Sequence, residues 1–70
     1  MAILKINGNE KEFTDGQLPA TLENLLDELK IKKTAIVAEI DGEIICREKY
    51  STTRICDGQN IELVKFMGGG

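Results

Sequence analysis

Apolar side chains alternate with other residues at the start of the chain, where Ala2, Leu4 and Ile6 occupy every second position. This two-residue period is typical of a half-buried strand. Asn7-Gly8-Asn9 is a turn signal, so we predict that Glu10–Phe13 returns as a second strand and completes a hairpin. Leu4, Ile6 and the phenylalanine that ends the second strand are expected to supply the hairpin's share of the core.

A helical period begins after Pro19. The leucines of this segment lie on one helical face, at spacings of three and four: Leu22, Leu25, Leu26 and Leu29. Thr21 precedes them, and its hydroxyl can accept a hydrogen bond from a free backbone N–H at the start of a helix. We predict a helix from Thr21 to Lys30. Because so short a helix is marginal in water, packing against a sheet must hold it.

Three further segments have the composition of strands: Ala35–Ile40, Glu43–Cys46 and Ile61–Phe66. Asp41-Gly42 predicts a hairpin between the first two, and Asp57-Gly58-Gln59-Asn60 predicts a turn before the third. Residues 47–53 are polar apart from Tyr50 and are interpreted as a loop or a single helical turn. By the same alternation, Ala38 and Ile40 are expected to point inward.

The last strand has two faces of different character. Ile61 and Leu63 point to one side, and Val64 and Phe66 point to the other. If the first pair faces the helix, the second pair lies on the open side of the sheet, and Ile3 shares that side. Apolar groups gathered on an open face suggest a docking surface, although single exposed apolar residues are common on proteins.

A lone helix must bury its leucine stripe against one face of one sheet. We therefore predict an α+β fold: a mixed sheet of four to five strands with one helix packed across one face. If the first and last strands pair, they are parallel and central. We expect one domain over residues 1–66 and a flexible, glycine-rich tail over residues 67–70.

Composition narrows the function classes. The formal net charge of −3 gives no basic face of the kind that binds phosphate backbones, so nucleic acid is not an expected partner. No apolar run reaches the roughly 18 residues of a membrane-spanning helix. The N-terminus lacks the zones of a signal peptide, so we expect a cytoplasmic protein without a membrane partner. The chain has no histidine, the commonest general base, and no metal-ligand cluster, so we do not expect an enzyme.

The two cysteines are Cys46 and Cys56, which do not form a Cys-x-x-Cys motif. Without a secretory signal we expect reduced thiols. We interpret both as filling strand or core positions rather than as redox groups. Their spacing alone does not decide whether they could form a disulfide.

The chain ends in Phe66-Met67-Gly68-Gly69-Gly70. A tail without side chains can carry its terminal carboxylate into a narrow channel on another protein. Enzymes that activate carboxylates attach AMP, which turns a poor electrophile into a good one. Terminal glycines are a weak signal by themselves, but here they follow an apolar last strand in this order of elements.

The sequence resembles ThiS-type sulfur carriers, small β-grasp, ubiquitin-like proteins of thiamine biosynthesis, over its whole length. Besides Asn7-Gly8, four blocks carry the resemblance, and the last is the most specific: Thr21–Leu26, Glu39–Ile45, Arg47–Tyr50 and Asp57–Gly70. The chain departs from the family pattern at Cys46, where a Val-Pro-Arg-like sequence is common, and at Tyr50, where tryptophan is frequent. Both departures concern packing rather than the tail.

The resemblance implies that a ThiF-like enzyme uses ATP and Mg²⁺ to adenylate the carboxylate of Gly70. Sulfur from a donor such as a cysteine desulfurase would then replace AMP and leave a thiocarboxylate. A ThiG-like thiazole synthase would accept that sulfur. Gly68 and Gly69 would provide slim reach, and four residues would contact partners: Ile3, Val64, Phe66 and Met67. The carrier would be a co-substrate with no permanently bound cofactor.

Other functions remain open at this point. MoaD-like carriers for molybdopterin and carriers for tRNA thiolation share the fold and the tail. The length and the Phe-Met-Gly-Gly-Gly ending favour the thiamine carrier. A ubiquitin-like modifier attached to lysines through Gly70 is another alternative, and so is a β-grasp binding module whose glycines are a frayed end.

Overall fold

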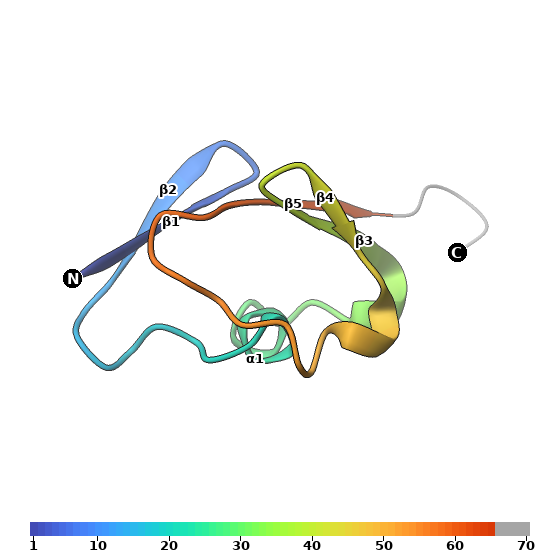
Figure 1. The fold of residues 1–70 in the computed structure, drawn as a ribbon, viewed down its shortest axis with the longest axis horizontal. Helices are drawn as coiled ribbons and strands as arrows, with labels where there is room; N and C mark the ends of the chain where they lie inside the picture. Colours follow the sequence, from blue (N-terminus) through green and yellow to red (C-terminus); the bar gives the residue numbers. More distant parts are fainter. Residues whose placement is uncertain (66–70) are drawn as a thin grey trace.

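The structure is a computed structural model that describes residues 1–65, in which a five-stranded sheet carries one α-helix across one face (Figure 1). The strands are β1 (Ala2–Ile6), β2 (Asn9–Phe13), β3 (Ile36–Ile40), β4 (Glu43–Ile45) and β5 (Asn60–Lys65). The helix α1 is Leu22–Glu28, and two single 3-10 turns, η1 (Lys33–Ala35) and η2 (Arg47–Lys49), flank the β3–β4 hairpin. The predicted α+β fold is confirmed.

The sheet joins the two ends of the described chain. Its strand order is β2-β1-β5-β3-β4, which places β5 at the centre. β1 and β5 are parallel, with Lys5 opposite Asn60 and Ile6 opposite Ile61, whereas the other neighbouring strands are antiparallel. The first and last strands do pair, and they are parallel and interior to the sheet, as expected for the case in which they pair.

Both predicted hairpin turns are present. Asn7 and Gly8 have φ of 52° and 83°, and Asp41 and Gly42 have φ of 52° and 87°. Positive φ at both central residues defines the type I′ turn, whose twist matches that of the strands it joins. Asparagine and aspartate tolerate this conformation better than other side chains, which explains why these pairs predict the turns.

The helix begins as predicted but ends earlier. Thr21 Oγ1 accepts a hydrogen bond from the N–H of Asn24 at 3.2 Å, so it is the N-cap. The helix stops at Glu28 rather than at Lys30, because Lys30 takes a positive φ of 59°. The N–H of Ile31 then donates to the carbonyl of Leu26 at 2.9 Å, which closes the helix with a Schellman-type cap.

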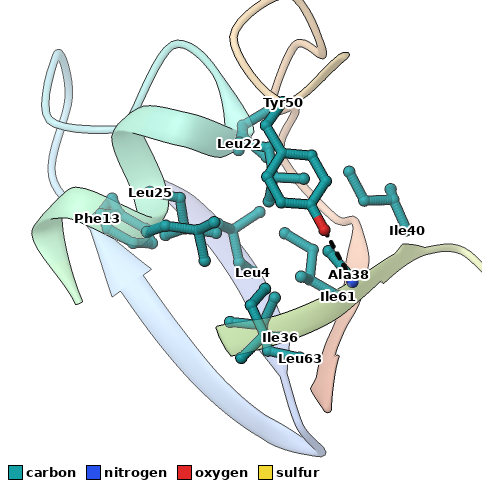
Figure 2. Close-up of a cluster of buried hydrophobic side chains, with 12 residues drawn as sticks. Leu4, Phe13, Leu22, Leu25, Ile36, Ala38, Ile40, Tyr50, Ile61 and Leu63 are labelled. Carbon is teal, nitrogen blue, oxygen red and sulfur yellow. Dashed lines mark hydrogen bonds between the residues drawn. The ribbon is translucent and has the colours of Figure 1, made fainter. Parts of the chain in front are cut away.

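The core lies between α1 and the sheet (Figure 2). The residues predicted to face inward are fully or nearly fully buried, except that Ile6 and Leu29 are half-buried. Tyr50 was not expected there, yet only 2% of it is exposed. Its hydroxyl accepts a hydrogen bond from the backbone N–H of Ala38 at 3.2 Å, the dashed line in Figure 2. The turn η2 thus places the Tyr50 ring over one end of the core, although the rest of this segment is polar.

The interpretation of the cysteines as strand or core fillers is wrong. Both thiols are free and exposed. β4 ends at Ile45, so Cys46 falls just beyond the strand and before η2. Cys56 lies just before the turn at Asp57-Gly58 and is exposed at the surface there.

Candidate functional site

The predicted site residues fall into two groups. Phe66, Met67 and Gly68–Gly70 lie outside the described residues. Ile3 and Val64 lie on described strands, β1 and β5. The geometry of the candidate site is therefore built from β5, the strand that runs toward the tail, and from the strands beside it.

Two aspartates fix the beginning of β5. Asp41 Oδ1 accepts from the N–H of Asn60 at 2.9 Å, and the N–H of Asp41 donates to the carbonyl of Asn60 at 2.8 Å. Asp57 Oδ1 accepts from the N–H of Ile3 at 2.8 Å, and Gly58 donates to the carbonyl of Ile3. Both turn motifs therefore hold neighbouring strands in register as well as reversing the chain.

Asn7 extends the contact between β1 and β5 beyond the end of β1. Its backbone N–H donates to the carbonyl of Ile61 at 2.9 Å. Its side-chain Oδ1 accepts from the N–H of Leu63 at 2.7 Å, and Nδ2 donates to the carbonyl of Leu63 at 3.3 Å. The amide thus pairs with Leu63 much as one more strand residue would, two residues before the end of the described chain.

The sheet face opposite α1 is open, since α1, the segment between β2 and α1, and the segment between β4 and β5 lie on the other side of β5 in Figure 1. Ile3 and Val64 both point to this face and are 37% and 53% exposed. They do not meet. Lys5 on β1 lies opposite Asn60 on β5. Val64 lies four residues after Asn60, and Ile3 lies two residues before Lys5, so the two side chains are about 20 Å apart along the strands.

Val64 is instead part of a separate apolar cluster. It lies directly opposite Val37 on β3, and Ile44 on β4 lies opposite Glu39, one step diagonally from Val37. Diagonal neighbours on one sheet face are within reach of long side chains. Ile44 is 66% exposed and Val37 is half-buried. We call Val37, Ile44 and Val64 the Val64 patch.

Sequence reasoning missed two members of this patch. The alternation that placed Ala38 and Ile40 inward also places Val37 on the open face, so a signal for Val37 was present. Ile44 had no comparable signal, because Ile44-Ile45 is an apolar pair and only the register of β4 decides which isoleucine faces outward.

Two other kinds of site are absent from the described residues, and one groove is present. Within residues 1–65, no group of three or more Cys, Asp or Glu side chains could hold a metal ion. No α-helix in that range is long and apolar enough to cross a bilayer. A groove of about 390 Å³ lies between α1 and the segment that follows it, where Lys33 Nζ is 3.0 Å from Glu23 Oε1. The charges of Glu23 and Lys33, which line this groove, therefore partly neutralise one another.

Comparison with known proteins gives consistent matches. The model of a family described as the ThiS family matches residues 4–70. The chain is 31% identical over 68 residues to the sulfur carrier protein ThiS of Bacillus subtilis (strain 168), covering 97% of this chain and 100% of that protein. It is 36% identical over 67 residues to a thiazole synthase of Paramagnetospirillum magneticum, covering 96% of this chain but only 20% of that protein. The chain thus spans a fifth of the length of this second relative.

Solved structures agree with the sequence matches. The crystal structure of a thiamine biosynthesis protein (ThiS) from Geobacter metallireducens superposes with a TM-score of 0.82 at 33% identity, covering 97% of this chain and 99% of that one. The solution structure of a thiamine biosynthesis protein from the same organism gives a TM-score of 0.75 at 34% identity, covering 100% and 88%. The likeness extends over the whole sheet and helix.

Proposed function

The chain belongs to the ThiS family, and on this premise we propose that it is a cytoplasmic sulfur carrier protein of thiamine biosynthesis. The observation that carries the proposal is the family match, which runs through the terminal glycines to residue 70. The matched carrier from Bacillus subtilis is covered along its whole length, which supports the same role for a chain of this size.

The proposed reaction begins at the carboxylate of Gly70. A carboxylate resists nucleophiles because its charge is shared between two oxygens. A ThiF-like enzyme, using ATP and Mg²⁺, would join AMP to this carboxylate and release pyrophosphate, which creates an acyl carbon with a good leaving group. Gly68 and Gly69 would let the tail enter the enzyme's channel, since they carry no side chain that could obstruct ATP or the nucleophile.

The second step introduces sulfur. The terminal sulfur of a persulfide, supplied by a donor such as a cysteine desulfurase, would attack the acyl carbon and displace AMP. A reducing thiol would then cleave the S–S bond of the resulting acyl disulfide and leave a thiocarboxylate on Gly70. The thiocarboxylate sulfur is a far better nucleophile than a carboxylate oxygen, which is the chemical reason to carry sulfur in this form.

The proposed acceptor is a ThiG-like thiazole synthase, which would take the sulfur into the thiazole ring. One matched relative is itself a thiazole synthase that contains a segment similar to this chain. A carrier joined to its acceptor meets it at a high effective concentration, so such a segment supports a carrier–acceptor pairing. In this proposal the chain is a protein co-substrate, and the chemistry is performed by its partners.

The described structure supports a role in which the folded domain binds the partner and positions the tail. β5 is the central strand, and it is hydrogen-bonded at its start by Asp41 and near its end by Asn7. Val64, one residue before the end of β5, belongs to an apolar patch that a partner could cover. Phe66 and Met67 would extend that contact toward the glycines.

The experiment is an intact-mass measurement. The full chain is incubated with the adenylating enzyme of its organism, ATP, Mg²⁺, a persulfide donor and a reducing thiol. We expect the C-terminal residue to gain the mass difference between sulfur and oxygen. Adding the thiazole synthase and its other substrates should then return the original mass, whereas a molybdopterin or tRNA-thiolation acceptor should not.

The matched control is the chain without Gly69 and Gly70, which we expect to fold normally and to gain no sulfur. If the shortened chain still acquires sulfur, the proposed attachment site is wrong. If the full chain instead becomes linked to lysines of other proteins, the protein is a modifier rather than a sulfur carrier.

A further inference from the structure

Two carboxylates of like charge face each other on the open side of the sheet. Glu39 on β3 and Glu62 on β5 are direct cross-strand partners. Each lies one residue away from inward-facing side chains, so both point away from α1. Directly opposite residues of an antiparallel pair have Cβ atoms roughly 4.5–5.5 Å apart, and like charges in such positions destabilise a sheet.

Nothing within residues 1–65 offsets this repulsion through an ion pair. The salt bridges of that range join the N-terminus to Asp15 and Lys33 to Glu23. Lys5 is the cation on the same face of the described strands. It lies opposite Glu10 on β2 and opposite Asn60 on β5, one diagonal step from Glu62, but it forms no ion pair with either carboxylate. Within residues 1–65, Glu39 and Glu62 therefore form no ion pair, and the direct cross-strand placement of two like charges is unfavourable in the free protein.

The carboxylate pair also adjoins the Val64 patch. Ile44 lies opposite Glu39 on β4, and Val37 and Val64 form the next outward-facing row of β3 and β5. The open face therefore presents two carboxylates at the border of three apolar side chains, at the end of β5 nearer the tail. Such a surface is complementary to a cation that is embedded among apolar groups.

We propose that this face docks a protein partner that inserts an arginine side chain between Glu39 and Glu62 while its apolar side chains cover the Val64 patch. A guanidinium has a planar fork of donors that fits carboxylates and is more weakly hydrated than an ammonium group, so it suits an apolar border. The inference rests on the proposed function, in which the adenylating enzyme must hold this chain while its tail is in the active site.

Charge complementarity also decides against two other occupants. A second copy of this chain docking through the same patch would bring two carboxylate pairs together, because a two-fold interface presents the same surface twice. A nucleic acid would add phosphates to a face that already repels them. A basic, partly apolar protein surface is the occupant that removes the repulsion.

The test compares Glu39→Gln and Glu62→Gln with a matched control, Glu12→Gln, in the full chain. Glu12 lies on the same face opposite Ile3, at the other end of the sheet. Binding to the adenylating enzyme is measured by titration calorimetry at two salt concentrations. We expect Glu39→Gln and Glu62→Gln each to raise Kd about tenfold and to flatten the salt dependence of Kd, whereas the control leaves both unchanged.

A second comparison sets Val64→Ser beside the same control, Glu12→Gln. We expect the Val64 variant to weaken binding and the control to leave it unchanged, since Glu12 lies at the other end of the sheet, outside the patch. Thermal melting separates docking from folding: removing one carboxylate should leave Tm equal or higher, because it relieves the repulsion in the free protein.

The outcomes also separate this inference from the function on which it rests. If the wild-type chain acquires sulfur, and Glu39→Gln and Glu62→Gln bind the enzyme as tightly as the wild type does, the docking proposal is overturned and the carrier function stands. Equal weakening by Glu12→Gln would also overturn it, because docking would then not be centred on Glu39, Glu62 and the Val64 patch. Absence of sulfur transfer to the wild type would instead count against the carrier function.

Discussion

Among single residues, Asn7 combines a turn conformation with a tertiary contact. Its φ of 52° suits the hairpin, and its amide makes two hydrogen bonds to the backbone of Leu63. The turn can be predicted from the Asn-Gly pair, because that preference is local. The contact with Leu63 could not be predicted, because it depends on the parallel pairing of strands at opposite ends of the chain.

We expect Asn7→Gly to loosen the end of β5 without disturbing the hairpin, since glycine accepts the same positive φ. The loss of two hydrogen bonds should lower the free energy of unfolding by about 1–2 kcal/mol. Urea denaturation measures this change, and hydrogen exchange of the Leu63 amide locates it. The Leu63 amide should exchange faster in the variant.

The matched variant is Asn7→Asp, which retains an acceptor for the N–H of Leu63 but loses the donor to its carbonyl. Leu63 should remain protected in this variant although stability falls. Unchanged protection of Leu63 in Asn7→Gly would show that the side-chain contact does not hold β5.

Among the elements, α1 shows how a local pattern can place a helix and miss its end. Thr21 and the leucine spacing identified the start and the buried face, both of which the structure confirms. The predicted end, Lys30, lies beyond the observed end, because the helix is stopped by the positive φ of Lys30 itself. This position is usually occupied by glycine, and a lysine there gives no signal in the sequence. The burial of Tyr50 could not be predicted for a related reason. Its neighbours in the sequence are polar, and only the turn η2 directs its side chain into the core.

Lys30 therefore offers a stabilising substitution. Replacing it with glycine should raise the free energy of unfolding by about 0.5–1 kcal/mol, since glycine pays no steric penalty at positive φ. Thermal melting followed by circular dichroism measures the effect. Part of the gain is offset by removing a positive charge near the negative end of the helix dipole.

The control for this substitution is Lys32→Gly, which removes the same charge two residues later. Lys32 has an ordinary extended backbone, with φ of −76° and ψ of 128°. Glycine there should destabilise the protein, because it only adds freedom to the unfolded chain. If both variants had a lower Tm than the wild type, the positive φ of Lys30 would cost the folded protein little free energy.

For the whole molecule, the fold could be predicted largely from the sequence, whereas the proposed docking face could be predicted only in part. One amphipathic helix and several alternating strands leave few arrangements that bury all apolar faces. That β1 and β5 would be parallel if paired could be predicted, but the pairing itself, with its register, could not. The outward direction of Val64 follows from local alternation. The opposition of Glu39 and Glu62 does not, because it requires the register between β3 and β5.

The predicted boundary between domain and tail, after residue 66, can be tested by a truncation series. Every fully buried apolar residue of the described range lies between Leu4 and Leu63, so deleting residues 67–70 should leave Tm unchanged. Deleting residues 64–70 removes the pairing of Val64 with Val37 and of Lys65 with Ile36.

The longer deletion should therefore uncover Ile36, which is only 1% exposed, and cost about 1–2 kcal/mol, a fall in Tm of roughly 10 °C for a domain of this size. Thermal melting of the three chains under one buffer condition gives the comparison. A comparable fall on deleting residues 67–70 alone would place the end of the domain beyond residue 66. The glycines would then contribute to the fold as well as carrying the carboxylate.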